Sequence, residues 1–382
     1  MSCIPYMGSK RKTANKYFDI IQKENPNSKI IYDLFAGGFA ITAYFYKCGW
    51  DVVANDKNKY VVALFDYIFN QQGNLDIFTK FVTRKEFFDV LKNPDNYDDY
   101  WVGYVMTCLS FGNDQSSYLY GKDMEPTKLA GHKLVVDKDI SLIKEMLPGL
   151  DFSSVLEVDG LHPRRSSLRN LAVKLFRELY HEKFKVDIKN KDERYATFKK
   201  YVKGLKEKVK NGEKGCDDLV KLKGLEKLEH LQRLERLQHL QHLEKLEQLQ
   251  RLPQLEQLNN LDTLQTLTNQ EIPLFTNSNK IKLFAKSYDE IDIPKDVVIY
   301  CDPPYKGTYE YSEGGFDHEK FWLWVKQKSK TNPVYISEYQ APDDFVSVLS
   351  YHRKSTLQGG NQQHTNQPNE CLFRIIDSNT KT

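Results

Sequence analysis

Two short apolar segments set the strongest constraint on how this chain folds. Each of them leads into a turn, and a helical pattern follows the turn. Residues 29–34 lead into the glycine turn Ala36-Gly37-Gly38, and residues 51–54 end at Asn55-Asp56. Helical patterns follow both turns. Short apolar runs that alternate with helices are typical of parallel strands joined by crossover helices. The sequence therefore predicts the α/β class, with a doubly wound parallel sheet.

The strand pattern returns near the end of the chain after a long interruption. An apolar strand is expected at 295–300, a helix at 316–326 and another strand at 333–337. The 382 residues exceed the roughly 100–200 residues of a usual domain. A domain split by an insert is therefore expected, in four segments: the first half of the α/β domain at 1–70, a mainly helical lobe at 71–215, a leucine-rich tract at 216–272 and the second half at 273–382.

The leucine-rich tract carries leucine at every third position from Leu222 to Leu267, with mainly Glu, Gln, Lys, Arg and His between. An α-helix has about 3.6 residues per turn, so each successive leucine slips by about 60° and no single apolar stripe persists. A coiled coil, which needs a period of 3.5, is disfavoured. We expect a long, poorly packed helix interrupted near Pro253, with disorder or a repeat solenoid as alternatives, and we assign the tract no chemistry.

The charge of the chain is unevenly distributed. Its net charge is +3, yet residues 164–210 hold 16 Lys and Arg against six acids, a local charge of +10 that leaves −7 for the rest. A phosphate-facing surface has such a polarised charge, although a solvated helical face is the alternative. A loop at 111–118 and a basic turn at 163–169 are candidate DNA contacts, and Arg164, Arg165 and Arg169 are the DNA-binding residues that we expect.

The six cysteines are scattered without a CxxC pair or metal-ligand spacing, which argues against a disulfide framework and a zinc site. No apolar run approaches the ~18 residues that a membrane span needs. We therefore expect a soluble intracellular protein, without metal and without a membrane partner.

The strongest chemical signal is Asp302-Pro303-Pro304-Tyr305, which directly follows an apolar strand. Ligands of open α/β sheets bind beyond the carboxyl ends of strands. There the Asp302 carboxylate and the Pro303 carbonyl can each accept a hydrogen bond from an amine, and Tyr305 offers a ring on which a base can stack. Asp-Pro-Pro is also common turn chemistry, so a plain turn is the alternative.

Three weaker signals precede this motif. The glycine turn after residue 34 lets a cofactor approach the backbone, although it lacks the full dinucleotide-binding pattern. Asp56 ends the next strand, where an acid can bond ribose hydroxyls or simply cap a helix. The segment 6–12 is a basic Gly-Ser turn that can hold an anion, or an ordinary basic tail.

Taken together and in chain order, these motifs resemble the Dam-like family of adenine-specific DNA methyltransferases, alpha group. The motifs are Tyr6-Met7-Gly8-Ser9-Lys10, Asp33-Leu34-Phe35-Ala36-Gly37-Gly38, Asp56 and Asp302-Pro303-Pro304-Tyr305, and Glu370-Cys371-Leu372-Phe373 looks like the family's closing strand. Two positions depart from the pattern: Ser9 stands where a second glycine is more usual, and Ala36 stands within the glycine loop. The resemblance covers residues 1–70 and 280–382.

The resemblance implies a Rossmann-like methyltransferase sheet with an inserted target-recognition domain, and S-adenosyl-L-methionine as the cofactor. Its contacts would be Tyr6, Lys10, Asp56 and Asp302, with Phe35 and Gly37 as the pocket wall. Asp302, Pro303 and Tyr305 would be catalytic, acting on the N6 amine of a flipped adenine in double-stranded DNA. Direct transfer requires no catalytic cysteine, so we expect Cys301 to serve strand packing.

The resemblance further implies a cytoplasmic monomer of a prokaryotic or phage-infected cell, with room for a cognate restriction endonuclease as partner. Two alternatives stay open at this point. One is an amino-methyltransferase that acts on RNA or on protein, and the other is a catalytically inactive interaction protein built around the leucine tract. The DNA recognition sequence cannot be read from the residues.

Overall fold

The computed structural model describes residues 3–211, 225–253, 280–305, 315–351 and 369–375. The chain divides into two compact units. The sheet unit comprises residues 1–75, 87–119 and 245–382, and the helical unit comprises residues 76–86 and 120–244. Residues 87–119, which fall in the expected insert, thus lie in the sheet unit, and the four segment boundaries drawn from the sequence remain predictions.

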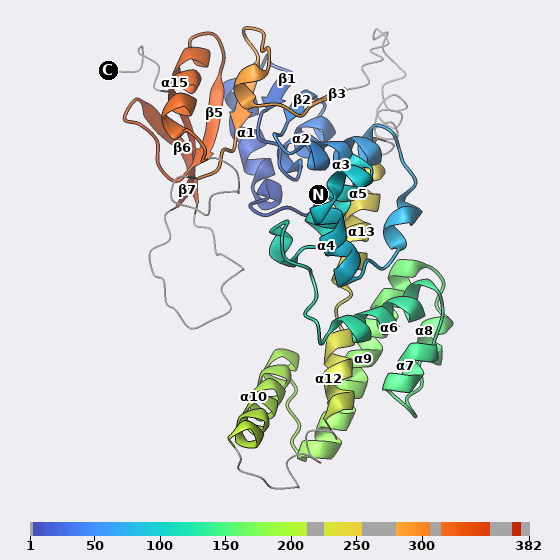
Figure 1. The fold of residues 1–382 in the computed structure, drawn as a ribbon. Helices are drawn as coiled ribbons and strands as arrows, with labels where there is room; N and C mark the ends of the chain where they lie inside the picture. Colours follow the sequence, from blue (N-terminus) through green and yellow to red (C-terminus); the bar gives the residue numbers. More distant parts are fainter. Residues whose placement is uncertain (1–2, 212–224, 254–279, 306–314, 352–368, 376–382) are drawn as a thin grey trace, which may run out of the picture. The chain divides into compact units, whose positions relative to one another are not determined.

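The sheet unit is built on a seven-stranded sheet of order β3-β2-β1-β4-β5-β7-β6. The first five strands in this order are parallel, and β7 is antiparallel to both of its neighbours. This mixed sheet confirms the predicted α/β class and the Rossmann-like methyltransferase fold (Figure 1). The strands are β1 Ile30–Asp33, β2 Asp51–Asn55, β3 Ile281–Phe284, β4 Val298–Cys301, β5 Val334–Glu338, β6 Phe345–Tyr351 and β7 Glu370–Ile375.

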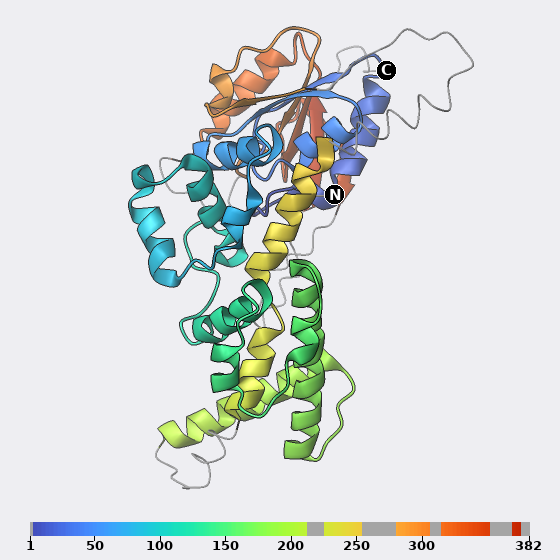
Figure 2. The ribbon, with the colours of Figure 1, turned by 90° about the vertical axis from the view of Figure 1, so that its right-hand side faces the viewer.

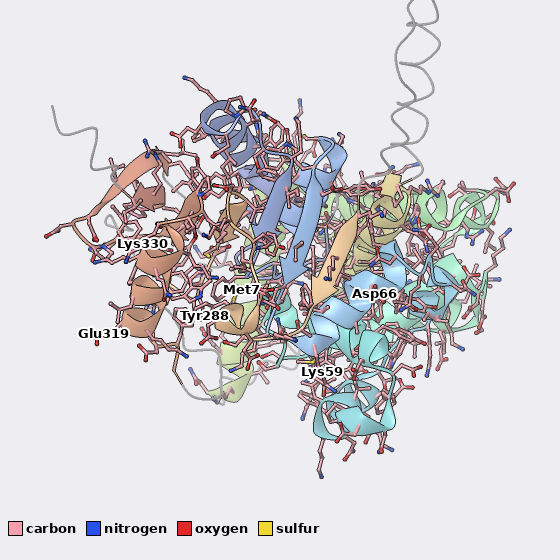
Figure 3. The ribbon with its side chains drawn as sticks, turned by 90° about the horizontal axis from the view of Figure 1, so that it is seen from above. Met7, Lys59, Asp66, Tyr288, Glu319 and Lys330 are labelled. Carbon is pink, nitrogen blue, oxygen red and sulfur yellow. The ribbon has the colours of Figure 1, made fainter. Side chains whose placement is uncertain are left out.

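Side chains of the central strands point alternately to the two faces of the sheet, as the strand period of two requires. Tyr300 on β4 meets the ring of Tyr17 on α1, with ring centroids 5.7 Å apart. Its neighbours Ile299 and Cys301 join instead the buried cluster around Phe321 of α15. Cys301 is therefore a packing residue, as expected. Figure 3 shows Tyr288 beside α15, which carries Glu319.

Helices of the sheet unit begin at polar caps that the sequence supplies. Asn58 accepts hydrogen bonds from the Tyr60 and Val61 amides at the start of α3, and Asp317 accepts one from the Lys320 amide at the start of α15. The elements are η1 Lys10–Lys12, α1 Ala14–Glu24, α2 Ala40–Lys47, α3 Lys59–Phe69, η3 Pro94–Asn96, α5 Asp99–Cys108, η4 Phe111–Asn113, η5 Tyr288–Glu290 and α15 His318–Lys328. Three further elements, η2 Leu75–Thr79, α4 Arg84–Lys92 and α13 Gln238–Gln250, cross the limits of the units.

Every regular element of the helical unit is a helix within the part of the chain that the structure describes (Figure 2). One buried cluster joins Leu168, Phe176, Phe198 and the leucines of α12. None of the described helices in the chain is both long enough and apolar enough to span a membrane. The helices are α6 Glu125–Val136, α7 Ser141–Met146, α8 Ser153–Leu156, α9 Leu161–Phe184, α10 Lys191–Lys210 and α12 Glu226–Leu234.

The leucine tract is well packed where the structure describes it, so the expectation of a poorly packed helix was wrong. The nine leucines at every third position from Leu225 to Leu249 are each at most 3% exposed. Leucines that wind around a helix are all buried only when neighbours cover it on several sides, and α12 lies against both α6 and α9. Residues 254–279, which include the rest of the tract, lie outside the described residues.

The tract is also broken earlier than the sequence suggested. The chain leaves helical hydrogen bonding between α12 and α13, at residues 235–237, well before Pro253. At this break the Lys128 ammonium, itself 5% exposed, donates to the carbonyls of Arg233 and Arg236. Carbonyls at the end of a helix lack a helical partner, so the buried lysine satisfies groups that the break leaves unpaired.

We expect Leu231→Ala to lower the free energy of unfolding by about 2–5 kcal/mol, because the side chain is fully buried in the core of the helical unit. Chemical unfolding followed by circular dichroism measures the loss. Gln238→Ala, at an exposed position of the same tract, is the control and should change stability by less than ~0.5 kcal/mol. Equal stability of the two variants would contradict a packing role for the tract.

Candidate active site

Three acids lie together because three neighbouring strands end at one edge of the sheet. β4 and β2 flank β1 in parallel register. Asp33 is the last residue of β1, while Asp56 and Asp302 directly follow β2 and β4. The chain winds outward from β1 through β2 to β3 and in the opposite direction from β4 to β5. The acids therefore stand at the topological switch point, where open α/β sheets bind ligands.

The N-terminal segment passes over the glycine loop at this edge. The Ile4 amide donates to the Gly38 carbonyl at 3.0 Å. A Cβ atom on Gly38 would come within 2.5 Å of the Ile4 carbonyl oxygen, and one on Gly37 would come within 3.0 Å of the Tyr6 ring. Only glycine allows this approach, which brings Tyr6 and the following Lys10 to the acids.

Lys10 forms ion pairs with two acids of the site. Its ammonium lies 2.6 Å from Oδ2 of Asp302 and 3.2 Å from Oε1 of Glu370. The side chains of Lys10, Asp302 and Glu370 are 5%, 18% and 0% exposed, so water barely screens these charges. Burial raises the pKa of Asp302 above its ordinary value, and the Glu370 charge adds to this, whereas Lys10 opposes it.

Glu370 is the residue of this site that the sequence analysis did not single out. It begins β7, and besides Lys10 it accepts a hydrogen bond from the Tyr305 hydroxyl at 2.8 Å. A second bond comes from the Tyr17 hydroxyl at 3.4 Å, which links Glu370 to α1. The sequence did offer a signal, because Glu370 is an acid at the start of an apolar strand. The sequence analysis named it only as part of the closing strand.

Tyr305 and Pro303 lie where the Asp-Pro-Pro-Tyr motif was expected to place them, directly after β4. Pro303 is buried, and the Tyr305 ring is fixed at both ends. Its hydroxyl bonds Glu370, and its ring meets the edge of Tyr339 with centroids 4.7 Å apart. The Lys10 ammonium lies 5.1 Å from its ring centroid. The ring orientation is therefore set by the same residues that hold Asp302.

Asp56 binds the glycine loop. Its two carboxylate oxygens accept hydrogen bonds from the Gly37 amide at 2.7 Å and the Asn58 amide at 2.9 Å. Burial raises the pKa of Asp56, and these two bonds oppose the rise. Because each carboxylate oxygen has two acceptor positions, Asp56 can hold the loop and still accept a bond from a ligand hydroxyl.

Asp33 is a second acid that the sequence analysis left without a role. It is 1% exposed, and its Oδ2 accepts bonds from the amide and hydroxyl of Thr42 at 3.2 and 2.7 Å. Its Oδ1 is buried and has no partner among the described residues. Burial, supplemented by the nearby charges of Asp302 and Asp56, raises the pKa of Asp33 to about 7.

Phe35 forms an apolar wall beside the acids. Its ring lies 5.4 Å from that of Tyr288 and 5.8 Å from those of Phe316 and Phe321. Tyr288 and Phe316 come from segments far away in sequence, which is why no local pattern indicated them. The wall can cover one face of a flat apolar group.

The three arginines expected to contact DNA all lie on α9 of the helical unit, in different surroundings. Arg164 is 9% exposed, and its Nε donates to the Val135 carbonyl, while Arg165 pairs with Glu244 at 2.7 Å. These two side chains join helices to one another, and their contact with DNA stays a prediction. Arg169 is 51% exposed and stays a candidate.

Comparison with known proteins adds one match. Residues 6–102, about a quarter of the chain, match the sequence model of the family described as D12 class N6 adenine-specific DNA methyltransferase. The matched stretch contains Tyr6, Lys10, the glycine loop and Asp56. A search of curated proteins found no match to this chain.

We expect Asp33→Asn to stabilise the protein increasingly as the pH rises from 5 to 8. The folded-state pKa of about 7 lies above the ordinary value of 3.8. The stability that the protonated acid provides is therefore lost as the pH rises through 7, whereas asparagine cannot ionise. Each unit of pKa shift corresponds to about 1.4 kcal/mol. Thermal unfolding across this pH range measures the difference between variant and parent.

The matched control is Asp19→Asn, which removes an exposed acid of α1. Its difference from the parent should stay constant across the same pH range. A constant difference for Asp33→Asn as well would show that Asp33 does not titrate in this window.

Proposed function

We propose that this chain, whose residues 6–102 match the D12 class of N6 adenine-specific DNA methyltransferases, uses S-adenosylmethionine to methylate an adenine flipped out of duplex DNA, with Asp302 as the residue that binds the reacting amine. The observation that carries the proposal is the buried Lys10–Asp302 pair at the switch point of the sheet. It joins the motif after β4 to the N-terminal segment, and Asp56 stands on the same sheet edge.

The residues of the site fit the cofactor. When bound, S-adenosylmethionine supplies an electrophilic methyl group on a positively charged sulfonium. Asp33, Asp56, Asp302 and Glu370 face this sheet edge with Lys10 as the cation that pairs with two of them, so the site favours a positively charged ligand. Oδ1 of Asp33 is buried without a partner among the described residues, and a positively charged ligand would compensate the charge of its carboxylate.

Each expected cofactor residue has a task in this assignment. Asp56 would accept a bond from a ribose hydroxyl while it holds Gly37 in place. Phe35 would cover the flat base of the cofactor, and the wall formed with Tyr288 supports this. Tyr6, packed against the glycine loop, would close the pocket together with Lys10.

Catalysis in this proposal rests on two hydrogen-bond acceptors. The exocyclic amine of adenine is a poor nucleophile because its lone pair is delocalised into the ring. Acceptance of its two N–H bonds by the Asp302 carboxylate and the Pro303 carbonyl would favour a pyramidal nitrogen with a localised lone pair. Asp302 must be ionised to do this, and Lys10 favours the ionised form. The same carboxylate can take up the proton that the amine loses.

Tyr305 would be the surface on which the flipped base stacks. A stacking ring is effective when it does not have to be ordered on binding, and here Glu370 and Tyr339 already fix it. Correct positioning of the reacting groups can contribute about 7–11 kcal/mol to rate enhancement in well-oriented cases.

The two alternatives have less support. The family match is to enzymes that act on adenine in DNA, which disfavours an RNA or protein substrate. An interaction protein built around the leucine tract would need exposed leucines, but those from Leu225 to Leu249 are buried. A companion restriction endonuclease and a monomeric state remain parts of the proposal.

We expect Asp302→Ala to lower methyl transfer to duplex DNA by roughly 100-fold or more, since an acceptor of this kind typically contributes that much. Incorporation of a labelled methyl group, followed by identification of N6-methyladenine and sequencing of the methylated sites, measures activity and target together. The control, Asp99→Asn, changes an exposed acid on α5 and should retain activity. Full activity of Asp302→Ala would refute the assignment.

We expect Glu370→Gln to shift the acidic limb of the pH–rate profile to lower pH. Glutamine still accepts the Tyr305 hydroxyl bond, but it removes a negative charge that raises the pKa of Asp302. Asp302 would then stay ionised at lower pH, and kcat should fall less than in Asp302→Ala. An acidic limb that does not move would argue that Glu370 acts only as a structural residue.

A further inference from the structure

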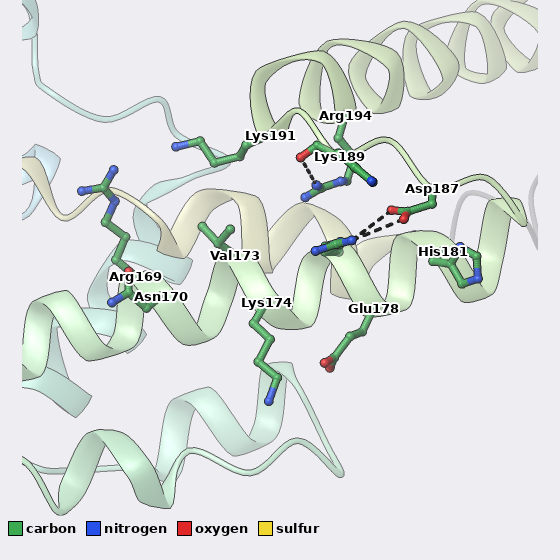
Figure 4. A pocket seen from close by; sticks show the side chains of 11 residues that line it. Arg169, Asn170, Val173, Lys174, Glu178, His181, Asp187, Lys189, Lys191 and Arg194 are labelled. Carbon is green, nitrogen blue, oxygen red and sulfur yellow. Dashed lines mark hydrogen bonds and ion pairs between the residues drawn. The ribbon is translucent and has the colours of Figure 1, made fainter.

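A groove of about 850 Å³ lies on the helical unit, between α9 and the residues that lead into α10 (Figure 4). It is separate from the site described above, since all residues that line it fall between 169 and 194. Six of them are cationic: Arg169, Lys174, Arg177, Lys189, Lys191 and Arg194. We call this feature the basic groove.

The two walls of the basic groove follow from local structure. On α9, Arg169, Val173, Arg177 and His181 recur every four residues, which places them on one face of the helix. The opposite wall begins after α9 ends at Phe184, and Asn190 caps the start of α10 with its side chain. The groove therefore forms where the chain changes direction between the two basic helices α9 and α10.

Arg194 fixes the wall that carries Lys189. It is 2% exposed, and its guanidinium donates to the carbonyls of Ile188 and Lys189 at 2.8 and 3.1 Å. No carboxylate pairs with it among the described residues. A buried cation held by carbonyls alone adds positive potential to the groove beside it.

Six cations line the groove against two acids, Glu178 and Asp187. Arg177 pairs with Asp187 at 3.3 Å, and Lys191 pairs with Glu235 at 2.5 Å. Arg169 lies 4.0 Å from the same Glu235, which is therefore shared. Lys174 and Lys189 are exposed and have no ion pair among the described residues. The groove thus presents cations that face solvent, which is the arrangement that a polyanion requires.

The surface continues beyond the groove. A neighbouring hollow of about 580 Å³ shares Asn170 and Lys174 with it. It adds the hydroxyls of Ser154, Ser166 and Ser167. Serine hydroxyls and asparagine amides are common partners of phosphate oxygens alongside lysine and arginine. A surface that extends on both sides of Lys174 suits a chain of phosphates better than a single anion.

The side chains of the groove also indicate which part of a nucleic acid they would contact. No phenylalanine, tyrosine or tryptophan lines either hollow, so bases have no ring on which to stack. Cations and hydroxyls without aromatics favour the sugar-phosphate backbone of a duplex over an unpaired strand.

We infer that the basic groove binds the phosphodiester backbone of the duplex DNA that the enzyme methylates, independently of its sequence. The inference rests on the proposed function for the identity of the polyanion. Arg169, Lys174 and Lys189 supply the contacts, whereas Arg177, Lys191 and Arg194 shape the groove. Unlike Arg164 and Arg165, these three contact side chains are exposed.

The test compares two triple variants of the full chain. Arg169→Gln/Lys174→Gln/Lys189→Gln removes the contacts, and Lys199→Gln/Lys200→Gln/Lys210→Gln removes three exposed cations of α10 that line neither hollow. Affinity for a labelled 30-base-pair duplex is measured by fluorescence anisotropy from 50 to 200 mM salt. Each lost phosphate contact reduces the slope of log affinity against log salt by about 0.9, so a reduction of roughly 2–3 is expected for the groove variant.

We expect the groove variant to bind DNA about 10-fold or more weakly at 150 mM salt, with the control near the parent. Its kcat at saturating DNA and its methylated sequence should not change, since the groove reads no bases. Equal affinities of the two variants would overturn the inference while the proposed function stands. Tighter groove-dependent binding of double-stranded RNA than of DNA would overturn the assignment to DNA. If the parent transfers no methyl group, the proposed function fails, and the anisotropy of the same variants still decides whether the groove binds the duplex.

Discussion

A single buried ammonium organises the catalytic half of this protein. Lys10 lies within hydrogen-bond distance of Asp302 and Glu370, and each of these residues comes from a different part of the chain. A charge so nearly excluded from water is tolerated only if it is paired, so the N-terminal segment, the end of β4 and the start of β7 are held to one geometry. Tyr305 is oriented through the same contact, because its hydroxyl bonds Glu370. The geometry of the site therefore depends on the pairing of Lys10 with the two carboxylates.

The parts of this arrangement that the sequence predicted are those with local causes. Apolar runs of strand length, a glycine turn and an acid at a strand end are readable from neighbouring residues, and they gave the α/β class and the position of the Asp-Pro-Pro-Tyr motif. Glu370 and Asp33 were not recognised as part of the site, because their significance depends on residues that only the fold brings near. The same holds for Tyr288, whose contact with Phe35 joins distant segments.

Two features of the helical unit show that burial cannot be read from periodicity or charge alone. A period of three was taken as incompatible with good packing, which is correct for a helix covered on one side. α12 is covered by both α6 and α9, and its winding leucines are buried. Arg164 and Arg165 were predicted to contact DNA because the segment is basic, and in the structure one donates to a carbonyl and the other pairs with Glu244. A cation count overestimates a binding surface wherever some cations serve as structural donors.

In the proposed function, the charges of the chain divide binding of DNA and binding of the cofactor between different residues. Asp33, Asp56, Asp302 and Glu370 gather acids at one edge of the sheet, which in the proposed function would suit a sulfonium rather than phosphates. Residues outside 164–210 carry a net charge of −7, so the excess positive charge of the chain is confined to that segment. Within that segment, the exposed cations that line the basic groove include Arg169 and Lys174 of α9 and Lys189 before α10, and the further exposed cations of α10 lie outside it. In the proposed function, this separation of charge would let the protein bind a polyanion without neutralising the acids assigned to methyl transfer.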